Sequence, residues 1–405
     1  MEKQISTISG LVSTWRKKAL SALPKYHTLL QQAIDDFEAF GLEYQDYFED
    51  VIDKKSFLPE KTTVDRLRHQ YMQTLQGYWL SLEQVVLQWQ TEYYSVILEQ
   101  AYEQSSAYLN TLRLPLPGSL IYFNRVTSIR YLPFTKIPIL GIPHLFSGPK
   151  RWSAMAHEIG HYLFWNLGNS LDETPGNQEQ LRIDAAQYLS EAGIAEKERG
   201  FVMPWLEEVF CDVAGTYIDG SGFVDSSEEF LRCQAGNETE TTFNDGHHPP
   251  LLLRPFVWRR ALKNVDRTIL RSGREPQLNP GTNIEFPALV ISGEERTRSL
   301  VAVPHEHEVE TASAETLLPA LETLVDFLNG KFDEILTNVH PRERTITAFQ
   351  ELKSFMEAQK ATGKRSKSPV YEMLLTPRVF EGGIEHTHGY YIPFHGWHES
   401  STHSH

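Results

Sequence analysis

The feature that most constrains this chain lies near its middle, where residues 157–161 are His-Glu-Ile-Gly-His. Histidines four positions apart on a helix project from one face, so both imidazoles can reach a single tetrahedral ion. Glu158 then stands beside the ion, where it can take a proton from a water molecule that the metal activates. The pattern therefore predicts a helix that carries His157 and His161 as metal ligands.

Apolar residues around this pattern recur at helical spacing, which indicates that one face of the helix is anchored in a core. They are Trp152, Met155, Ile159, Leu163 and Phe164. We expect the helix to start near Lys150, because Ser147 suits the cap and Pro149 suits the first turn. It should end near Leu167, before Gly168.

The alternative is a pair of surface histidines on an ordinary amphipathic helix, and the downstream sequence argues against it. Residues 203–215 predict a second helix, with Pro204 near its first turn and Gly220 past its end. Glu208 would complete a zinc site of two histidines and one carboxylate, leaving the fourth position open. Asp212, one turn further on, can accept the outer N–H of a ligand histidine.

Several positions of the second helix have a further or competing interpretation. Glu207, Glu208 and Asp212 can instead form a solvated acidic face, whereas Gly215 is expected to allow the two helices to approach closely. Cys211 carries a thiol that suits zinc, but it follows Glu208 by three residues and would reach the metal only if the helix were rotated. A buried packing cysteine is the favoured interpretation.

The spacing of His157-Glu158-x-x-His161 and Glu208-x-x-x-Asp212 resembles that of the gluzincin clan of zinc peptidases, over residues 120–260. The resemblance implies His157, His161 and Glu208 as zinc ligands, Glu158 as general base and acid, and Asp212 as the partner of His157. It also implies a zincin-like α+β core in which an edge strand, here within residues 122–142, receives extended substrate beside the cleft.

The segment from Gly246 to Arg254 resembles the one that follows the third ligand in the gluzincin branch containing the CAAX-processing membrane proteases. That resemblance implies His248 or Arg254 as a catalytic donor to the oxyanion of the tetrahedral intermediate. A helix-capping histidine and a structural cation are the alternatives. This chain departs from the branch in lacking membrane segments and in having Cys211 where the branch usually has alanine.

The flanking regions predict a four-part organisation. Residues 1–112 form a mainly helical region with breaks at Pro24, Gly41 and Pro59, and residues 62–110 form an amphipathic helix or helical hairpin. Residues 113–275 form the metallopeptidase core, with strands at 120–123 and 137–142 and a helix through Ala261.

The C-terminal part divides into a region 276–365 and a His-rich tail 366–405. The former is predicted to hold strands at 288–291 and 300–303 and helices at 314–335 and 341–359. His305 and His307 alternate along a strand and could chelate a metal, with an exposed strand edge as the alternative. The tail can bind metal or lie in the cleft as an internal plug, and a surface-draped tail is the alternative.

Charge and cysteine content narrow the function further. A net charge of -15 argues against nucleic acid as a partner and against anionic lipid surfaces. The two cysteines cannot form a disulfide framework and fit a reducing compartment. No apolar run has the length of a signal or membrane segment, so we expect a cytoplasmic protein.

These features predict a Zn²⁺-dependent endopeptidase that hydrolyses a protein or peptide substrate and is regulated by its non-catalytic regions. One alternative is a catalytically latent zinc-binding scaffold that binds a regulatory protein partner through the N-terminal helices. The other is a metal-dependent hydrolase of non-peptide amides.

Overall fold

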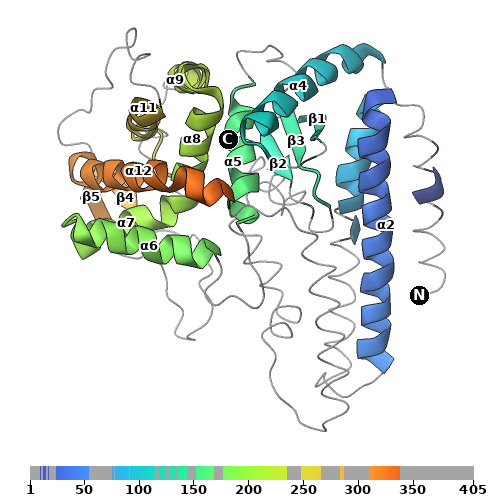
Figure 1. Cartoon of the computed structure of the whole chain (residues 1–405), viewed down its shortest axis with the longest axis horizontal. Helices are drawn as coiled ribbons and strands as arrows, with labels where there is room; N and C mark the ends of the chain where they lie inside the picture. The colour runs from blue at the N-terminus through green and yellow to red at the C-terminus, as the bar shows by residue number, and fades with distance from the viewer. Residues whose placement is uncertain are drawn as a thin grey trace. The chain divides into compact units, whose positions relative to one another are not determined.

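The computed structural model is mostly helical and contains two small sheets (Figure 1). It describes residues 24–53, 75–76, 78–90, 92–114, 116, 118–124, 127–130, 132, 135–143, 152–167, 177–234, 248–265, 283–286 and 310–337. It also describes five positions near the N-terminus, which are 10, 12–14 and 17. The described residues up to 143 belong to one compact unit and those from 152 to 337 to another. The four-part division predicted from the sequence stays a prediction.

The first unit pairs long helices with a three-stranded sheet. Its elements are α2 (Pro24–Asp53), a helical stretch at 78–89, α4 (Glu92–Thr111), β1 (Leu120–Asn124), β2 (Ser128–Arg130) and β3 (Ile139–Pro143). The central strand β3 runs parallel to β1 and antiparallel to β2. Helices α2 and α4 pack on β1, and the indole of Trp89 donates to the carbonyl of Ile121.

The strand predicted at 120–123 is confirmed as β1, and the one predicted at 137–142 is found as β3, which begins at Ile139; both apolar runs are buried. The predicted break at Gly41 is wrong, since α2 continues through it. A glycine costs a helix about 1 kcal/mol relative to alanine, and the buried side chains of Leu30, Ile34 and Phe37 anchor α2 in spite of that cost.

The second unit surrounds a central helix, α8 (Leu206–Asp219), whose residues are buried over most of its length. Helix α5 (Ala154–Trp165) packs along α8, and α9 (Ser221–Gln234) and α11 (Arg254–Val265) also contact it. Helix α12 (Ala314–Thr337) lies between α11 on one side and α6 (Asn177–Glu191) with α7 (Glu196–Val202) on the other (Figure 1). This arrangement places α8 at the centre of the unit's core.

Helix α8 begins and ends where the sequence predicts. A 3-10 turn, η3 (Met203–Trp205), contains Pro204 and leads directly into α8, and Gly220 follows its last residue. Helix α5 begins at Ala154 rather than near Lys150, after a turn at 152–153, and the expected cap Ser147 lies outside the described residues. The predicted helix at 314–335 is confirmed as α12, where Ser313 Oγ accepts the Thr316 N–H at 3.2 Å.

The second sheet is a hairpin of β4 (Asn283–Phe286) and β5 (Glu310–Ser313). Several sequence predictions lie outside the described residues: the strands at 288–291 and 300–303, His305 and His307, the helix at 341–359 and the tail at 366–405. Among the described helices, none is both long and apolar enough to cross a lipid bilayer.

Candidate metal centre

Helices α5 and α8 bring the two predicted ligand histidines against a carboxylate. The rings of His157 and His161 have centroids 5.0 Å apart on the face of α5 that packs on α8. Opposite them, Glu208 occupies the first turn of α8. The partial positive charge of a helix N-terminus stabilises a carboxylate at that place.

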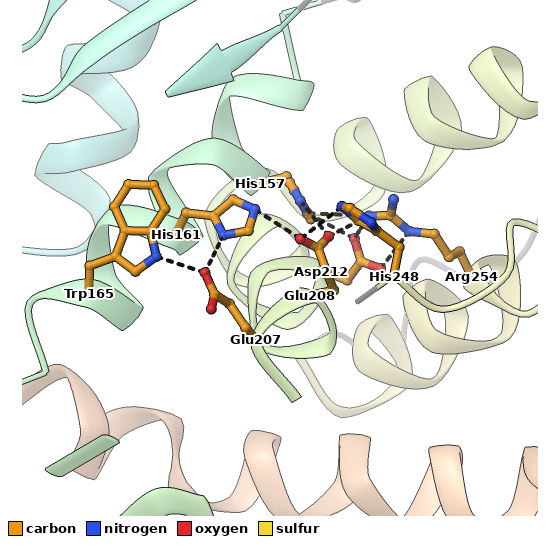
Figure 2. Close-up of polar contacts among 8 residues, drawn as sticks. All are labelled: His157, His161, Trp165, Glu207, Glu208, Asp212, His248 and Arg254. Carbon is orange, nitrogen blue, oxygen red and sulfur yellow. Dashed lines mark hydrogen bonds and ion pairs between the residues drawn. The ribbon is translucent and has the colours of Figure 1, made fainter. Parts of the chain in front are cut away.

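Glu208 lies between the two imidazoles (Figure 2). Its Oε2 is 3.3 Å from Nε2 of His157 and its Oε1 is 3.3 Å from Nε2 of His161. Oε1 is buried and has no hydrogen bond within the described part of the chain. A buried acceptor without a hydrogen bond is costly, and a cation shared with the two nitrogens would satisfy it. The donor set of two imidazoles and one carboxylate therefore suits a metal ion.

The outer nitrogens of both histidines are held by carboxylates (Figure 2). Nδ1 of His157 is 3.0 Å from Oδ1 of Asp212, and Nδ1 of His161 is 3.0 Å from Oε1 of Glu207. The same oxygen of Glu207 accepts the indole N–H of Trp165 at 2.7 Å. A carboxylate can only accept, so each Nδ1 carries a proton, and each Nε2 is the nitrogen that faces Glu208 and would bind a metal once it is deprotonated.

Arg254, the first residue of α11, binds Asp212 through two hydrogen bonds. Its Nε donates to Oδ2 at 3.0 Å and its Nη2 donates to Oδ1 at 2.6 Å. Nη2 also lies 4.0 Å from Oε2 of Glu208. The guanidinium thus neutralises a carboxylate that is completely buried.

His248 approaches Glu208 from outside the two central helices. Its Nε2 is 3.3 Å from Oε1 of Glu208, and its side chain is 35% exposed, compared with 12% for His157 and 5% for His161. His248 therefore contacts the carboxylate of Glu208 and is also accessible to solvent. The structure brings together all the predicted ligands and both predicted oxyanion donors around Glu208 (Figure 2).

Charges in this cluster shift the pKa values of its members. Burial lowers the pKa of His157, but Asp212 and Glu208 outweigh burial and raise the pKa above its ordinary value. Burial likewise opposes the charged form of His161, yet contacts with Cys211, Glu208 and Glu207 raise its pKa well above the ordinary value. The metal-free site therefore holds protons that a metal ion would displace.

The carboxylates of the cluster are shifted in different directions. Burial raises the pKa of Glu158, a half-buried residue of α5 next to His157. Burial would also raise the pKa of Glu208, but His248 and His161 hold it well below its ordinary range. Arg254 and His157 lower the pKa of Asp212 in the same way. Glu208 and Asp212 are therefore ionised at neutral pH, while Glu158 is the carboxylate best suited to exchange a proton.

Cys211 lies closer to the site than the sequence indicates. Its Sγ and one ring nitrogen from each of His157 and His161 all lie within 4.8 Å of one another. These three residues form a buried group that could hold a metal ion. Cys211 reaches the histidines without any rotation of α8, because α5 approaches α8 closely at this point. A Cβ on Gly160 would lie 2.7 Å from the Cα of Cys211.

The close approach was expected at Gly215, and this expectation is wrong. A Cβ on Gly215 would meet the ring of Phe223 on α9 at 2.9 Å, so that glycine accommodates α9. Gly160, inside the His-Glu-x-x-His pattern itself, accommodates α8. The spacing of small residues alone does not say which neighbouring helix each one faces.

No sequence motif indicates a role for Glu207 or Trp165, both of which contact His161. A signal was present in the number of carboxylates near the start of α8. Two histidines need one metal-binding carboxylate between them and an acceptor for each outer nitrogen, and Glu207, Glu208 and Asp212 supply these three groups.

Comparison with known proteins gives no further guidance, since no protein-family model, curated protein or solved structure matches this chain. The function of this chain is therefore inferred from the sequence pattern and from the geometry of these side chains.

Proposed function

We propose that this chain is a zinc-dependent endopeptidase that hydrolyses peptide bonds of a protein or peptide substrate. The observation that carries the proposal is the carboxylate of Glu208, which lies 3.3 Å from Nε2 of both His157 and His161 and keeps one buried oxygen without a hydrogen bond. These three residues would hold the ion. A zinc ion bound there would lower the pKa of a water molecule and polarise a substrate carbonyl.

The donor chemistry supports zinc in particular. Imidazole nitrogens with one carboxylate are the protein ligands of many catalytic zinc sites, and three protein donors leave one position for water or substrate. Carboxylates on the outer nitrogens of both histidines orient the rings and increase their basicity. Calcium and magnesium prefer oxygen donors, which are the minority in this cluster.

Glu158 is proposed as the general base. It follows His157 directly on α5 and is half-buried. Burial raises its pKa, which brings the carboxylate closer to the range where it can both accept and return a proton near neutral pH. In the proposed reaction Glu158 takes a proton from the attacking water and then delivers it to the leaving amine.

The geometry favours His248 over Arg254 as the donor to the oxyanion. Arg254 already donates two hydrogen bonds to Asp212, whose negative charge it balances. His248 reaches the site from its exposed side, with Nε2 3.3 Å from Glu208. We therefore assign His248 to transition-state stabilisation and Arg254 to positioning Asp212, which in turn orients His157.

A peptide substrate is proposed from the resemblance to gluzincins, in which an edge strand within residues 122–142 would receive extended backbone. Strand β2 falls within that span and lies at an edge of the described three-stranded sheet, which belongs to the compact unit that does not contain the metal site. Edge strands present unpaired backbone groups that bind extended chains. A latent zinc-binding scaffold stays the alternative, and the buried thiol beside the histidines is the observation that favours it.

The test combines elemental analysis of bound metal with cleavage of an unstructured protein substrate, for the wild type and Glu158→Gln. We expect one zinc per chain in both proteins and a cleavage rate reduced about 100-fold or more in the variant. Glu315→Gln, an exposed glutamate of α12, is the matched control and should behave as wild type. Absence of zinc would refute the site, and equal cleavage by Glu158→Gln would refute the role of that residue.

A further inference from the structure

A thiol shares the metal centre with the imidazoles and the carboxylate. Cys211 is fully buried on α8, one turn after Glu208. Its Sγ lies within 4.8 Å of one ring nitrogen each of His157 and His161, the same two side chains whose Nε2 atoms flank Glu208. The two imidazoles therefore have the thiol of Cys211 and the carboxylate of Glu208 as neighbours, both from α8.

The position of the thiol follows from the contact between the helix backbones. A Cβ on Gly160 would lie 2.7 Å from the Cα and 3.1 Å from the Cβ of Cys211. With α5 this close, the Cys211 side chain lies in the layer between the helices rather than in solvent, beside the rings of His157 and His161. The neighbours of Cys211 include two imidazoles, which are metal ligands and which a cysteine that only fills space does not need.

A second observation points to a ligand at the same place. Oε1 of Glu208 is buried without a hydrogen bond and lies 3.3 Å from Nε2 of His161. A cation bound by the imidazoles and the thiolate would also satisfy this oxygen. The Glu208 oxygen and the Cys211 thiol therefore both lie against His161.

We propose that Cys211 is a fourth donor to this metal, and that its thiolate closes the coordination of the ion in the resting protein. The inference rests on the proposed function and adds a form of regulation to it. Two imidazoles, one carboxylate and one thiolate complete a tetrahedral zinc site, whereas catalysis requires an open position. Binding converts the thiol to a thiolate and releases one proton to solvent; opening the site reverses this, as the sulfur leaves the ion and takes up a proton.

Cobalt(II) is the direct probe of this donor, because a thiolate bound to cobalt gives a charge-transfer absorption in the near ultraviolet that imidazole and carboxylate do not give. We expect the band in the wild type at one cobalt per chain, and its loss in Cys211→Ala and in the isosteric Cys211→Ser. Cys233→Ala, which removes the chain's other cysteine, is the matched control and should keep the band. Cobalt affinity should fall at least about tenfold in both Cys211 variants, since even outer-shell partners are worth that much.

Zinc-loaded proteins then test the closed site. Cys211→Ala should cleave an unstructured protein substrate at least tenfold faster than wild type, because the alanine leaves a coordination position open. One bound cobalt without a thiolate band in the wild type would overturn the inference and leave the proposed peptidase standing. A Cys211-dependent band with no cleavage by wild type or either Cys211 variant would support the fourth donor and remove the peptidase proposal. Failure of the wild type to bind metal would overturn both.

Discussion

One carboxylate oxygen of Glu207 accepts two hydrogen bonds, from Nδ1 of His161 at 3.0 Å and from Nε1 of Trp165 at 2.7 Å. The indole also stacks on the imidazole, with ring centroids 5.4 Å apart. The ring of His161 is thus held both at its edge and on its face, which fixes the direction of the lone pair on Nε2.

Loss of this carboxylate should weaken metal binding without removing a ligand. We expect Glu207→Ala to reduce zinc affinity about 10- to 100-fold, the usual effect of removing the partner of a ligand histidine. Glu207→Gln should have a smaller effect, because its amide oxygen can still accept the Nδ1 proton. Competition with a chromophoric chelator would measure the affinities. The surface variant Glu315→Ala should match wild type, and an unchanged affinity in Glu207→Ala would show that Glu207 does not orient His161.

Metal affinity should rise with pH. The pKa values of His157 and His161 are raised above 6.5, so the metal-free site carries protons that must leave when the ion binds. Titration calorimetry at pH 7 in two buffers with different ionisation enthalpies should therefore report proton release. Binding enthalpies that are independent of the buffer would contradict the raised pKa values.

The same shifts set the stability of the metal-free protein. Protonated His157 and His161 stabilise the fold below pH 6.5, and this contribution is lost as pH rises through their raised pKa values. Asp212 and Glu208, whose pKa values are lowered, stabilise the fold above their ordinary pKa values, and this contribution is lost as pH falls through the lowered values. Denaturant unfolding of the metal-free chain at a series of pH values would measure the loss of stability at high pH and at low pH.

At the scale of helices, the centre depends on how closely α5 and α8 approach each other. A methyl group at position 160 would meet the Cys211 backbone at 2.7 Å, and backbone cannot move aside as a flexible side chain can. The pairing of these two helices is therefore sensitive to a single small substitution.

Gly160→Ala should lower the free energy of unfolding by about 1–3 kcal/mol through overpacking. Gly330→Ala is the matched control, because Gly330 lies inside α12 with nothing within 4 Å of the added Cβ. Alanine there should stabilise the helix by about 1 kcal/mol. Urea unfolding of both variants provides the comparison, and equal stability of the two would show that the contact at Gly160 yields easily.

The local parts of the site follow from the sequence, and its three-dimensional parts do not. Pro204 and Gly220 mark the limits of α8, and the helical spacing of His157 and His161 places them on one face. Whether Cys211 reaches the two histidines depends on the distance between α5 and α8. Gly160 sets this distance, and no periodicity in the sequence indicates it. Extrapolation from Gly215 was wrong for the same reason, because a glycine does not identify the helix that it faces.

For the whole molecule, the candidate metal centre lies within the unit formed by the described residues from 152 to 337. The three-stranded sheet belongs to the other unit. Binding to the folded state alone stabilises a protein by about 2.7 kcal/mol at a ligand concentration 100 times Kd. That stabilisation should appear in the unit that contains the site.

Removal of the proposed zinc ion by a chelator is therefore expected to increase amide hydrogen exchange in α5, α8 and α11 and to leave β1 and β3 unchanged. Exchange resolved by peptide, with mass spectrometry as the readout, measures both units in one sample. The strand peptides serve as the internal control. A uniform increase over both units would show that their unfolding is coupled, and no change in α5 or α8 would contradict metal binding between these helices.

The contact between Gly160 and Cys211 also limits what kind of movement can accompany a change of state at the centre. Because the backbones of α5 and α8 already touch there, the helices cannot move closer, and the spacing between them is fixed by hard-sphere contact rather than by adaptable side chains. The free variable is the χ1 torsion of Cys211, which has three staggered positions. An open and a closed centre would then share the same helix positions and differ by one side-chain rotamer and one proton.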